Sequence, residues 1–245
     1  MTQPPDGRVA AICGRGAALT ADIALELHRG GARIVLVSDD EQHVASVART
    51  LGSAGAEAGT VVSGLDSKEE VDRAFERVLA GFGRIDVLVN VTDQQPAYVP
   101  VAIESMDLGE WRRAAASEPT LVLLASQAVG RHMRERGSGR IVNLSSDAAE
   151  LCVNADGVGK VMVQGFTVGF ARELGAHGIT VNAVAAGPVA VDDVAADGVL
   201  DKQALKRPTT HADVGRTVSF LASEAGAGIT GQIIHVNGGY WVRPA

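Results

Sequence analysis

Short apolar runs alternate with segments of helical periodicity along nearly all of this chain, and this alternation limits the possible folds more than any other feature. The runs predict strands at Arg8–Cys13, Arg33–Val37, Thr60–Val62, Ile85–Val89, Arg140–Leu144, Ile179–Val184 and Gln232–Val236. The segments between them predict helices at Asp22–Arg29, Asp40–Leu51, Val71–Leu79, Pro119–Arg136 and Gly157–Leu174. Apolar strands joined by helices indicate a parallel sheet covered on both faces, which right-handed crossovers make a doubly wound, Rossmann-like α/β sheet.

The length of 245 residues and a hydrophobic content of 46% suit one α/β domain with a sizeable core. We expect a single domain over residues 1–245, because no repeat or linker interrupts the pattern. The longest irregular regions, Thr92–Met106 and Ala185–Lys206, each follow a predicted strand. Open α/β sheets bind ligands beyond the carboxyl ends of their strands, so we expect these regions to line a cleft for a small molecule.

Composition argues against several classes of partner. The net charge is −7 and no basic surface run stands out, which disfavours nucleic acid and anionic membranes as partners. No apolar run approaches the roughly 18–20 residues that a membrane helix needs. The two cysteines, Cys13 and Cys152, cannot form a disulfide framework, and the six histidines lack metal-ligand spacing. We therefore expect a cytoplasmic protein without a metal site.

Four segments of the pattern carry a more specific signature. They are Gly83–Asn90, Gly139–Ser146, Gly178–Val184 and Ile229–Gly239. Together they resemble strands of the classical short-chain dehydrogenase/reductase family, close to its 3-oxoacyl-carrier-protein reductase group. The resemblance covers nearly the whole chain. It implies a seven-stranded sheet of order 3-2-1-4-5-6-7 and a homodimer or homotetramer.

The nucleotide-binding turn of that family, Thr-Gly-x-x-x-Gly-x-Gly, resembles residues 13–20 of this chain. Gly14 matches the first glycine, but Ala18 and Thr20 occupy the second and third positions. Those glycines allow the backbone to approach a pyrophosphate without an intervening Cβ. We expect the β-branched Thr20, at the start of a helix, to be the larger obstruction. The departure favours a plain strand-to-helix turn over dinucleotide binding.

Other positions that resemble the family's cofactor contacts have also changed. Ser63 stands at the place of an adenine-contacting aspartate, and Val191 at that of a threonine that holds the nicotinamide carboxamide. Asn90 is retained after the fourth strand, and Asp39 follows the second. An acid at the latter place repels a 2′-phosphate, so any residual binding at Gly14, Asp39 and Asn90 should favour NAD(H) over NADP(H). We expect no cofactor.

The family's catalytic Asn, Ser, Tyr and Lys resemble Glu118, Ser146, Asp156 and Lys160 of this chain. A reductase needs an acid that protonates the carbonyl oxygen as hydride arrives. Tyrosine serves because a neighbouring lysine lowers its pKa from about 10 toward neutrality. An aspartate is ordinarily ionised at neutral pH, and Lys160 one helical turn away favours the charged form of Asp156. Asp156 would then have no proton to donate.

An ionised Asp156 is, however, a competent general base. With Lys160 as a cation, Ser146 as a hydrogen-bond donor and Glu118 as a second carboxylate, the site could relocate a proton. That chemistry suits a cyclisation, isomerisation, epimerisation or elimination. The alternative without function is an exposed Asp156–Lys160 helix pair worth only about 0.3 kcal/mol, with Ser146 capping a strand end.

Three functions remain open on the sequence alone. The preferred one is a catalyst of proton transfer, without nicotinamide redox chemistry, on a small organic and polyketide-like substrate. The second is a non-catalytic subunit that pairs with an active relative through the apolar segments Leu121–Gly130 and Val161–Phe170 and the tail Tyr240–Val242. The third is an NAD(P)H-dependent ketoreductase with a displaced acid, which the retained Ser146, Lys160 and Asn90 favour.

Overall fold

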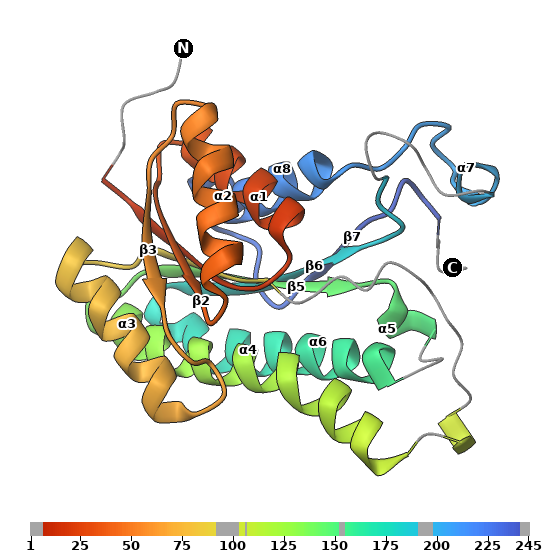
Figure 1. The fold of residues 1–245 in the computed structure, drawn as a ribbon, viewed down its shortest axis with the longest axis horizontal. Coiled ribbons are helices and arrows are strands. Elements are labelled where there is room, and N and C mark those ends of the chain that lie inside the picture. Colours follow the sequence, from red (N-terminus) through yellow and green to blue (C-terminus); the bar gives the residue numbers. More distant parts are fainter. Residues whose placement is uncertain (1–6, 92–102, 106, 152–154, 191–197, 241–245) are drawn as a thin grey trace.

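The computed structural model describes residues 7–91, 103–105, 107–151, 155–190 and 198–240. Its core is a seven-stranded sheet in which the strand order is β3-β2-β1-β4-β5-β6-β7 (Figure 1). Every neighbouring pair of strands is parallel. The predicted doubly wound, Rossmann-like class and strand order are therefore confirmed.

The elements have the following bounds. The strands are β1 (Val9–Gly14), β2 (Arg33–Ser38), β3 (Ala58–Val62), β4 (Val87–Val91), β5 (Gly139–Ser146), β6 (Ile179–Ala186) and β7 (Ile233–Val236). The longer helices are α1 (Ala17–Arg29), α2 (Glu41–Ser53), α3 (Lys68–Phe82), α4 (Leu108–Arg136), α6 (Ala155–Leu174) and α8 (His211–Leu221). The short ones are α5 (Ala148–Leu151), α7 (Val199–Lys202), η1 (Ile103–Ser105), η2 (Gly175–His177) and η3 (Glu224–Gly226). Within the described ranges, no helix combines the length and apolarity needed to cross a membrane.

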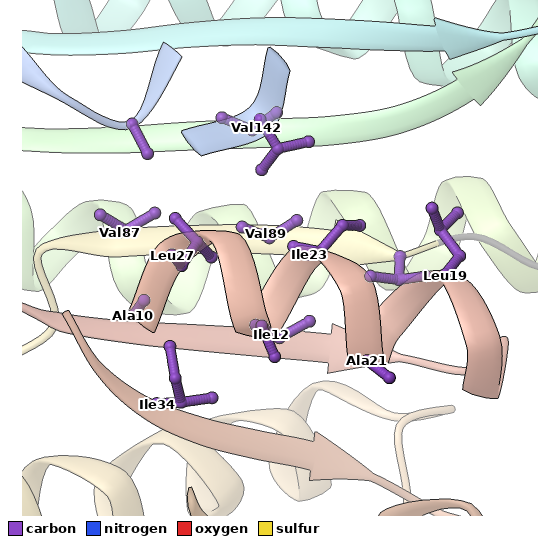
Figure 2. Close-up of a cluster of buried hydrophobic side chains, with 14 of the residues drawn as sticks. Ala10, Ile12, Leu19, Ala21, Ile23, Leu27, Ile34, Val87, Val89 and Val142 are labelled. Carbon is purple, nitrogen blue, oxygen red and sulfur yellow. The ribbon is translucent and has the colours of Figure 1, made fainter. Parts of the chain in front are cut away.

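Helices cover both faces of the sheet, α1, α2 and α8 on one side and α3, α4 and α6 on the other (Figure 1). On the first side, Leu19, Ile23 and Leu27 of α1 lie over the strands (Figure 2). Their partners there include Val87 and Val89 of β4. All five side chains are at most 3% exposed, and burying each contributes about 1.5–3 kcal/mol. This packing holds the start of α1 firmly beside the carboxyl ends of β1 and β4.

Helix α4 is the element that the sequence predicted least well. It begins at Leu108, whereas the pattern suggested a start near Pro119. The placement of Pro119 in a first turn was wrong, because this residue lies inside the helix. A proline in a helix interior lacks a donor and crowds the preceding turn, which is why the sequence suggested a boundary there. The longer helix matters for the site because Glu118 belongs to it.

Helix α8 is missing from the elements predicted by the sequence. A capping box begins it, in which the Thr210 side chain accepts from the amide of Asp213 and the Asp213 side chain accepts from the amide of Thr210. Val214, Val218 and Leu221 then bury one face of the helix against the core. The capping residues and the apolar spacing are both local features of the sequence, so this helix could have been predicted from them.

The two regions expected to be irregular lie largely outside the described residues. Residues 92–102 and 106 of the first are not described, nor are residues 191–197 of the second. The described part of the second region contains the end of β6 and the short helix α7. The expectation that both regions line a cleft stays a prediction.

The turn from β1 to α1 depends on Gly14. Its φ is +130°, and a Cβ on it would lie 2.0 Å from the carbonyl oxygen of Val91 in β4. Any side chain would therefore push β1 and β4 apart. Gly14 is required by sheet packing, whatever the turn binds.

A buried carboxylate ties the amino ends of the strands together. Asp86, just before β4, accepts from the amide of Val9 at 2.8 Å and forms ion pairs with Arg84 and Arg136. Burial alone would raise the pKa of Asp86. The hydrogen bonds from Arg84 and Val9 and the charge of Arg136 outweigh it and hold the pKa below its ordinary value.

We predict that Asp86→Asn lowers the free energy of unfolding by about 2 kcal/mol at neutral pH, because buried donors lose a charged acceptor. The folded-state pKa of Asp86 is depressed, so its contribution is present above the unfolded pKa of about 4 and fades as the pH falls below it. Urea unfolding at pH 7 and at pH 3.5 measures both effects.

Asp72→Asn is the matched control, because this more exposed carboxylate pairs with Lys68 and Arg131 on the surface. It should cost less than about 1 kcal/mol. An Asp86→Asn protein as stable as the wild type at pH 7 would refute the assignment.

Candidate functional site

The candidate catalytic residues come from three elements. Ser146 is the last residue of β5, Asp156 and Lys160 lie in the first turns of α6, and Glu118 lies on α4. Helices α4 and α6 run side by side under the sheet (Figure 1). The packing of these two helices places Glu118 against Lys160.

Lys160 and Glu118 form a buried ion pair. The Nζ atom of Lys160 lies 2.7 Å from Oε2 of Glu118. The lysine side chain is 1% exposed and the glutamate side chain 14% exposed. An ammonium group at such depth persists only beside a counter-charge, and Glu118 supplies it. From the sequence, Lys160 was expected to favour the charged form of Asp156, one helical turn away. The pairing with Glu118 was not expected, because a partner on another helix cannot be inferred from spacing.

Asp156 and Ser146 are more accessible. Asp156 is half-buried in the first turn of α6, where a carboxylate interacts favourably with the helix dipole. Ser146 is also half-buried, and its Oγ accepts from the amide of Ala148 at 3.3 Å. Residues 152–154, which separate the two in the chain, are not described. The geometry thus offers a carboxylate and a hydroxyl with partial exposure, beside an ion pair that is nearly closed to solvent.

The start of α1 differs from the expectation drawn from Thr20. Thr20 is 2% exposed and its Oγ1 has no hydrogen-bond partner among the described residues, so its side chain faces the protein interior. The Thr20 side chain therefore does not obstruct an approaching ligand, contrary to the expectation from the sequence. Ala18 is exposed at the first turn of the same helix, and its methyl group occupies that position instead. A third-position glycine would serve close helix packing, which explains why Thr20 is buried.

An ion pair spans the carboxyl ends of β1 and β2. The Nε atom of Arg15 donates to Oδ1 of Asp39 at 2.8 Å, and a second guanidinium nitrogen contacts Oδ2. Asp39 is therefore engaged by a bidentate partner at the edge where the sequence suggested a ribose contact. The sequence analysis missed Arg15, because it occupies a variable position of the motif and its partner is distant in the chain.

Asn90, retained from the family's pattern, is fully buried. Its Nδ2 donates to Oδ1 of Asn143 at 2.8 Å and to Oγ of Ser126 at 3.4 Å. Asn143 in turn donates to Thr167 of α6 at 2.9 Å. The side chain of Asn90 thus links β4 and β5 to the helices beneath them.

Other singled-out residues carry less chemistry. Cys13 is buried, as the sequence indicated, and burial, with a smaller effect from Asp39, raises the pKa of its thiol. Such a thiol is a small apolar group and not a nucleophile. Ser63 is half-buried and donates to the carbonyl oxygen of Glu70 at 3.4 Å. Cys152 and Val191 lie outside the described residues.

Comparisons with known proteins agree with this architecture. Residues 16–241 match the sequence model of a family described as Enoyl-(Acyl carrier protein) reductase. The chain is 32% identical to the short-chain reductase protein NovJ of Streptomyces niveus, over 98% of this chain and 99% of that protein. It is 31% identical to the 3-oxoacyl-[acyl-carrier-protein] reductase FabG of Haemophilus influenzae, over 96% and 99%. The crystal structure of gox2181 superposes with a TM-score of 0.84 at 27% identity, covering 97% of this chain and 96% of that one.

We predict that Glu118→Gln lowers the free energy of unfolding by about 3 kcal/mol, because it leaves a buried ammonium without its counter-charge. The double variant Glu118→Leu with Lys160→Met removes both charges at similar volume and should recover most of that loss. Denaturant unfolding of the three proteins measures the coupling. If the free energy of unfolding of Glu118→Gln lay within about 0.5 kcal/mol of the wild-type value, this would contradict the pairing.

Proposed function

This chain belongs to the short-chain dehydrogenase/reductase family, and from that premise we propose that it moves a proton on a small organic substrate without hydride transfer from a nicotinamide cofactor. Its relatives include proteins named as reductases and dehydrogenases. The proposal therefore assigns a different reaction to a shared fold. Acyl substrates related to those of the carrier-protein reductases are the first class to examine, by fold analogy.

The observation that carries the proposal is the Lys160–Glu118 ion pair. A family reductase uses its lysine to lower the pKa of a catalytic tyrosine. Here an aspartate stands in the tyrosine's place, and the lysine amine is 2.7 Å from a carboxylate on another helix. A lysine paired in this way, with a carboxyl group in place of the phenol, does not support protonation of a carbonyl.

Asp156 is the proposed general base. Its carboxylate would remove a proton from the carbon next to a substrate carbonyl, leaving the electron pair delocalised as an enolate. The Ser146 hydroxyl would donate a hydrogen bond to the enolate oxygen. The protonated Asp156 would then return the proton to the same or a neighbouring carbon. Lys160, which is 1% exposed, would act as a positioning residue that orients Glu118 beside the substrate.

The residues at the nucleotide edge do not fit a nicotinamide dinucleotide. The exposed Ala18 places a methyl group at the first turn of α1, where the family needs bare backbone against a pyrophosphate. Asp39, the residue that would accept from a ribose hydroxyl, is held by Arg15. We propose that the protein uses no cofactor. Any residual affinity that frees Asp39 from Arg15 should favour NAD(H), because the free carboxylate repels a 2′-phosphate.

The face formed by α4 and α6 supports self-association. A hollow of about 410 Å³ lies between the two helices, lined among others by Gly130, Gly165, Phe166, Gly169 and Phe170. A Cβ at either Gly165 or Gly169 would meet open space. A bare, partly aromatic groove of this kind suits close approach of another helix pair. We propose a homodimer through this face in the cytoplasm; pairing with an active relative would use the same surface.

We predict that the wild-type protein catalyses deuterium exchange next to the carbonyl of small ketones or acyl thioesters in D₂O without any nucleotide. Asp156→Asn should slow this exchange by about 100-fold, because the general base is lost. Proton NMR of the probe measures the rate. Asp201→Asn, at an exposed acid of α7, is the control and should leave the rate unchanged. Equal rates for wild type and Asp156→Asn, or NADH-dependent reduction of the same probes, would count against the proposal.

We predict that Gly169→Arg shifts the protein from dimer to monomer, because a long charged side chain enters the groove between α4 and α6. Light scattering after size exclusion measures the mass. Gly81→Arg makes the same change on the exposed side of α3 and should leave the dimer intact. A monomeric wild type, or a Gly169→Arg protein that stays dimeric, would rule out this interface.

A further inference from the structure

A second cluster of charged side chains lies next to the proposed site. Asp147 directly follows β5, Glu150 lies on α5, and His235 lies on β7. The Nδ1 atom of His235 is 2.7 Å from Oδ1 of Asp147, and its Nε2 atom is 3.7 Å from Oε1 of Glu150. The imidazole thus stands between two carboxylates, one on each side of its ring.

The Asp147 end of this cluster is tightly built. Asp147 is 2% exposed, and its second oxygen accepts from Nδ2 of Asn237 at 2.8 Å. Its amide donates to the carbonyl oxygen of Ala186 at 3.0 Å. A Cβ on Gly187 would lie 3.0 Å from Oδ2 of Asp147 and 2.4 Å from Cβ of Asn237. The carboxylate is therefore fixed against β6 and β7, and a carboxylate this deep needs both donors.

The cluster does not have the form of a metal site. Asp147 and Glu150 face opposite nitrogens of His235, so their oxygens and the ring do not converge on one point. In the part of the chain that the structure describes, no group of histidine, cysteine and acidic side chains is arranged to hold a metal ion. The arrangement instead connects separate segments of the chain.

The connected segments include the one that carries the proposed catalytic residues. In the sequence, Asp147 and Glu150 belong to the stretch that joins Ser146 to Asp156. Figure 1 shows α5 at the carboxyl end of β5, beside the start of α6. A helix of four residues has little stability of its own, so its position depends on side-chain contacts. His235, on a strand that is distant in sequence, contacts Glu150 of this helix and Asp147 just before it.

We infer that His235 is a positioning residue: by holding Asp147 and Glu150, it fixes the residues that directly follow Ser146 and thereby the position of the Ser146 hydroxyl in the proposed site. The effect reaches Ser146 through one contact, because the amide of Ala148 donates to Oγ of Ser146. The inference rests on the proposed function only for the roles of Ser146 and Asp156.

Amide hydrogen exchange, followed residue by residue by NMR, tests this inference without a substrate. His235→Leu removes both ring nitrogens, and the amides of Ala148 and Glu150 should then exchange about tenfold faster. His235→Gln keeps an amide donor for Asp147 and should restore exchange close to the wild-type rate. Amides of β1 should be unchanged in both variants. His177→Leu, at an exposed histidine of η2, is the matched control.

The inference is overturned if the Ala148 amide exchanges at the same rate in His235→Leu as in the wild type, or if it exchanges as fast in His235→Gln as in His235→Leu. It is also overturned if His235→Leu accelerates exchange of the β1 amides by the same factor. Should His235→Leu fail to fold, Glu150→Gln gives the same comparison of Ala148 with β1. Deuterium exchange into the ketone probes is measured alongside. If Asp156→Asn exchanges deuterium into these probes as fast as the wild type, the proposed function is refuted. The amide exchange rates alone decide the role of His235.

Discussion

The site depends on how the protein keeps a lysine charged in its interior. Lys160 is almost wholly inside, and the carboxylate of Glu118 at 2.7 Å compensates the desolvation of its ammonium. The pair requires α4 and α6 to lie close together, and it lies about one helical turn from Asp156. Without Glu118, the buried ammonium would lack this counter-charge.

Residues that the packing of the sheet requires are retained in this chain. Residues at the family's dinucleotide-contacting positions are altered. Gly14 is kept because β4 passes too near for a Cβ. Ala18 and the Arg15–Asp39 pair, which packing does not demand, depart from what a pyrophosphate and a ribose need. Stability and cofactor binding thus make separable demands on the same turn.

The sequence predicted the fold well because buried parallel strands are continuous apolar runs, such as Arg33–Val37, that leave few alternatives. It misplaced the start of α4 because Pro119 resembles a helix boundary in any local analysis. The position of Glu118 could be taken from the family resemblance, but its contact with Lys160 could not. Contacts between distant segments, such as Asp147 with His235, leave no local pattern in a single sequence.

We propose that the chain has the fold of a nicotinamide enzyme without a usable place for the nucleotide. Isothermal titration of the purified protein with NADH and with NADPH tests it most directly. We expect no saturable heat of binding up to millimolar concentrations of either nucleotide. Dissociation constants in the micromolar range for either nucleotide, weakened by a bulkier residue at Ala18, would contradict it.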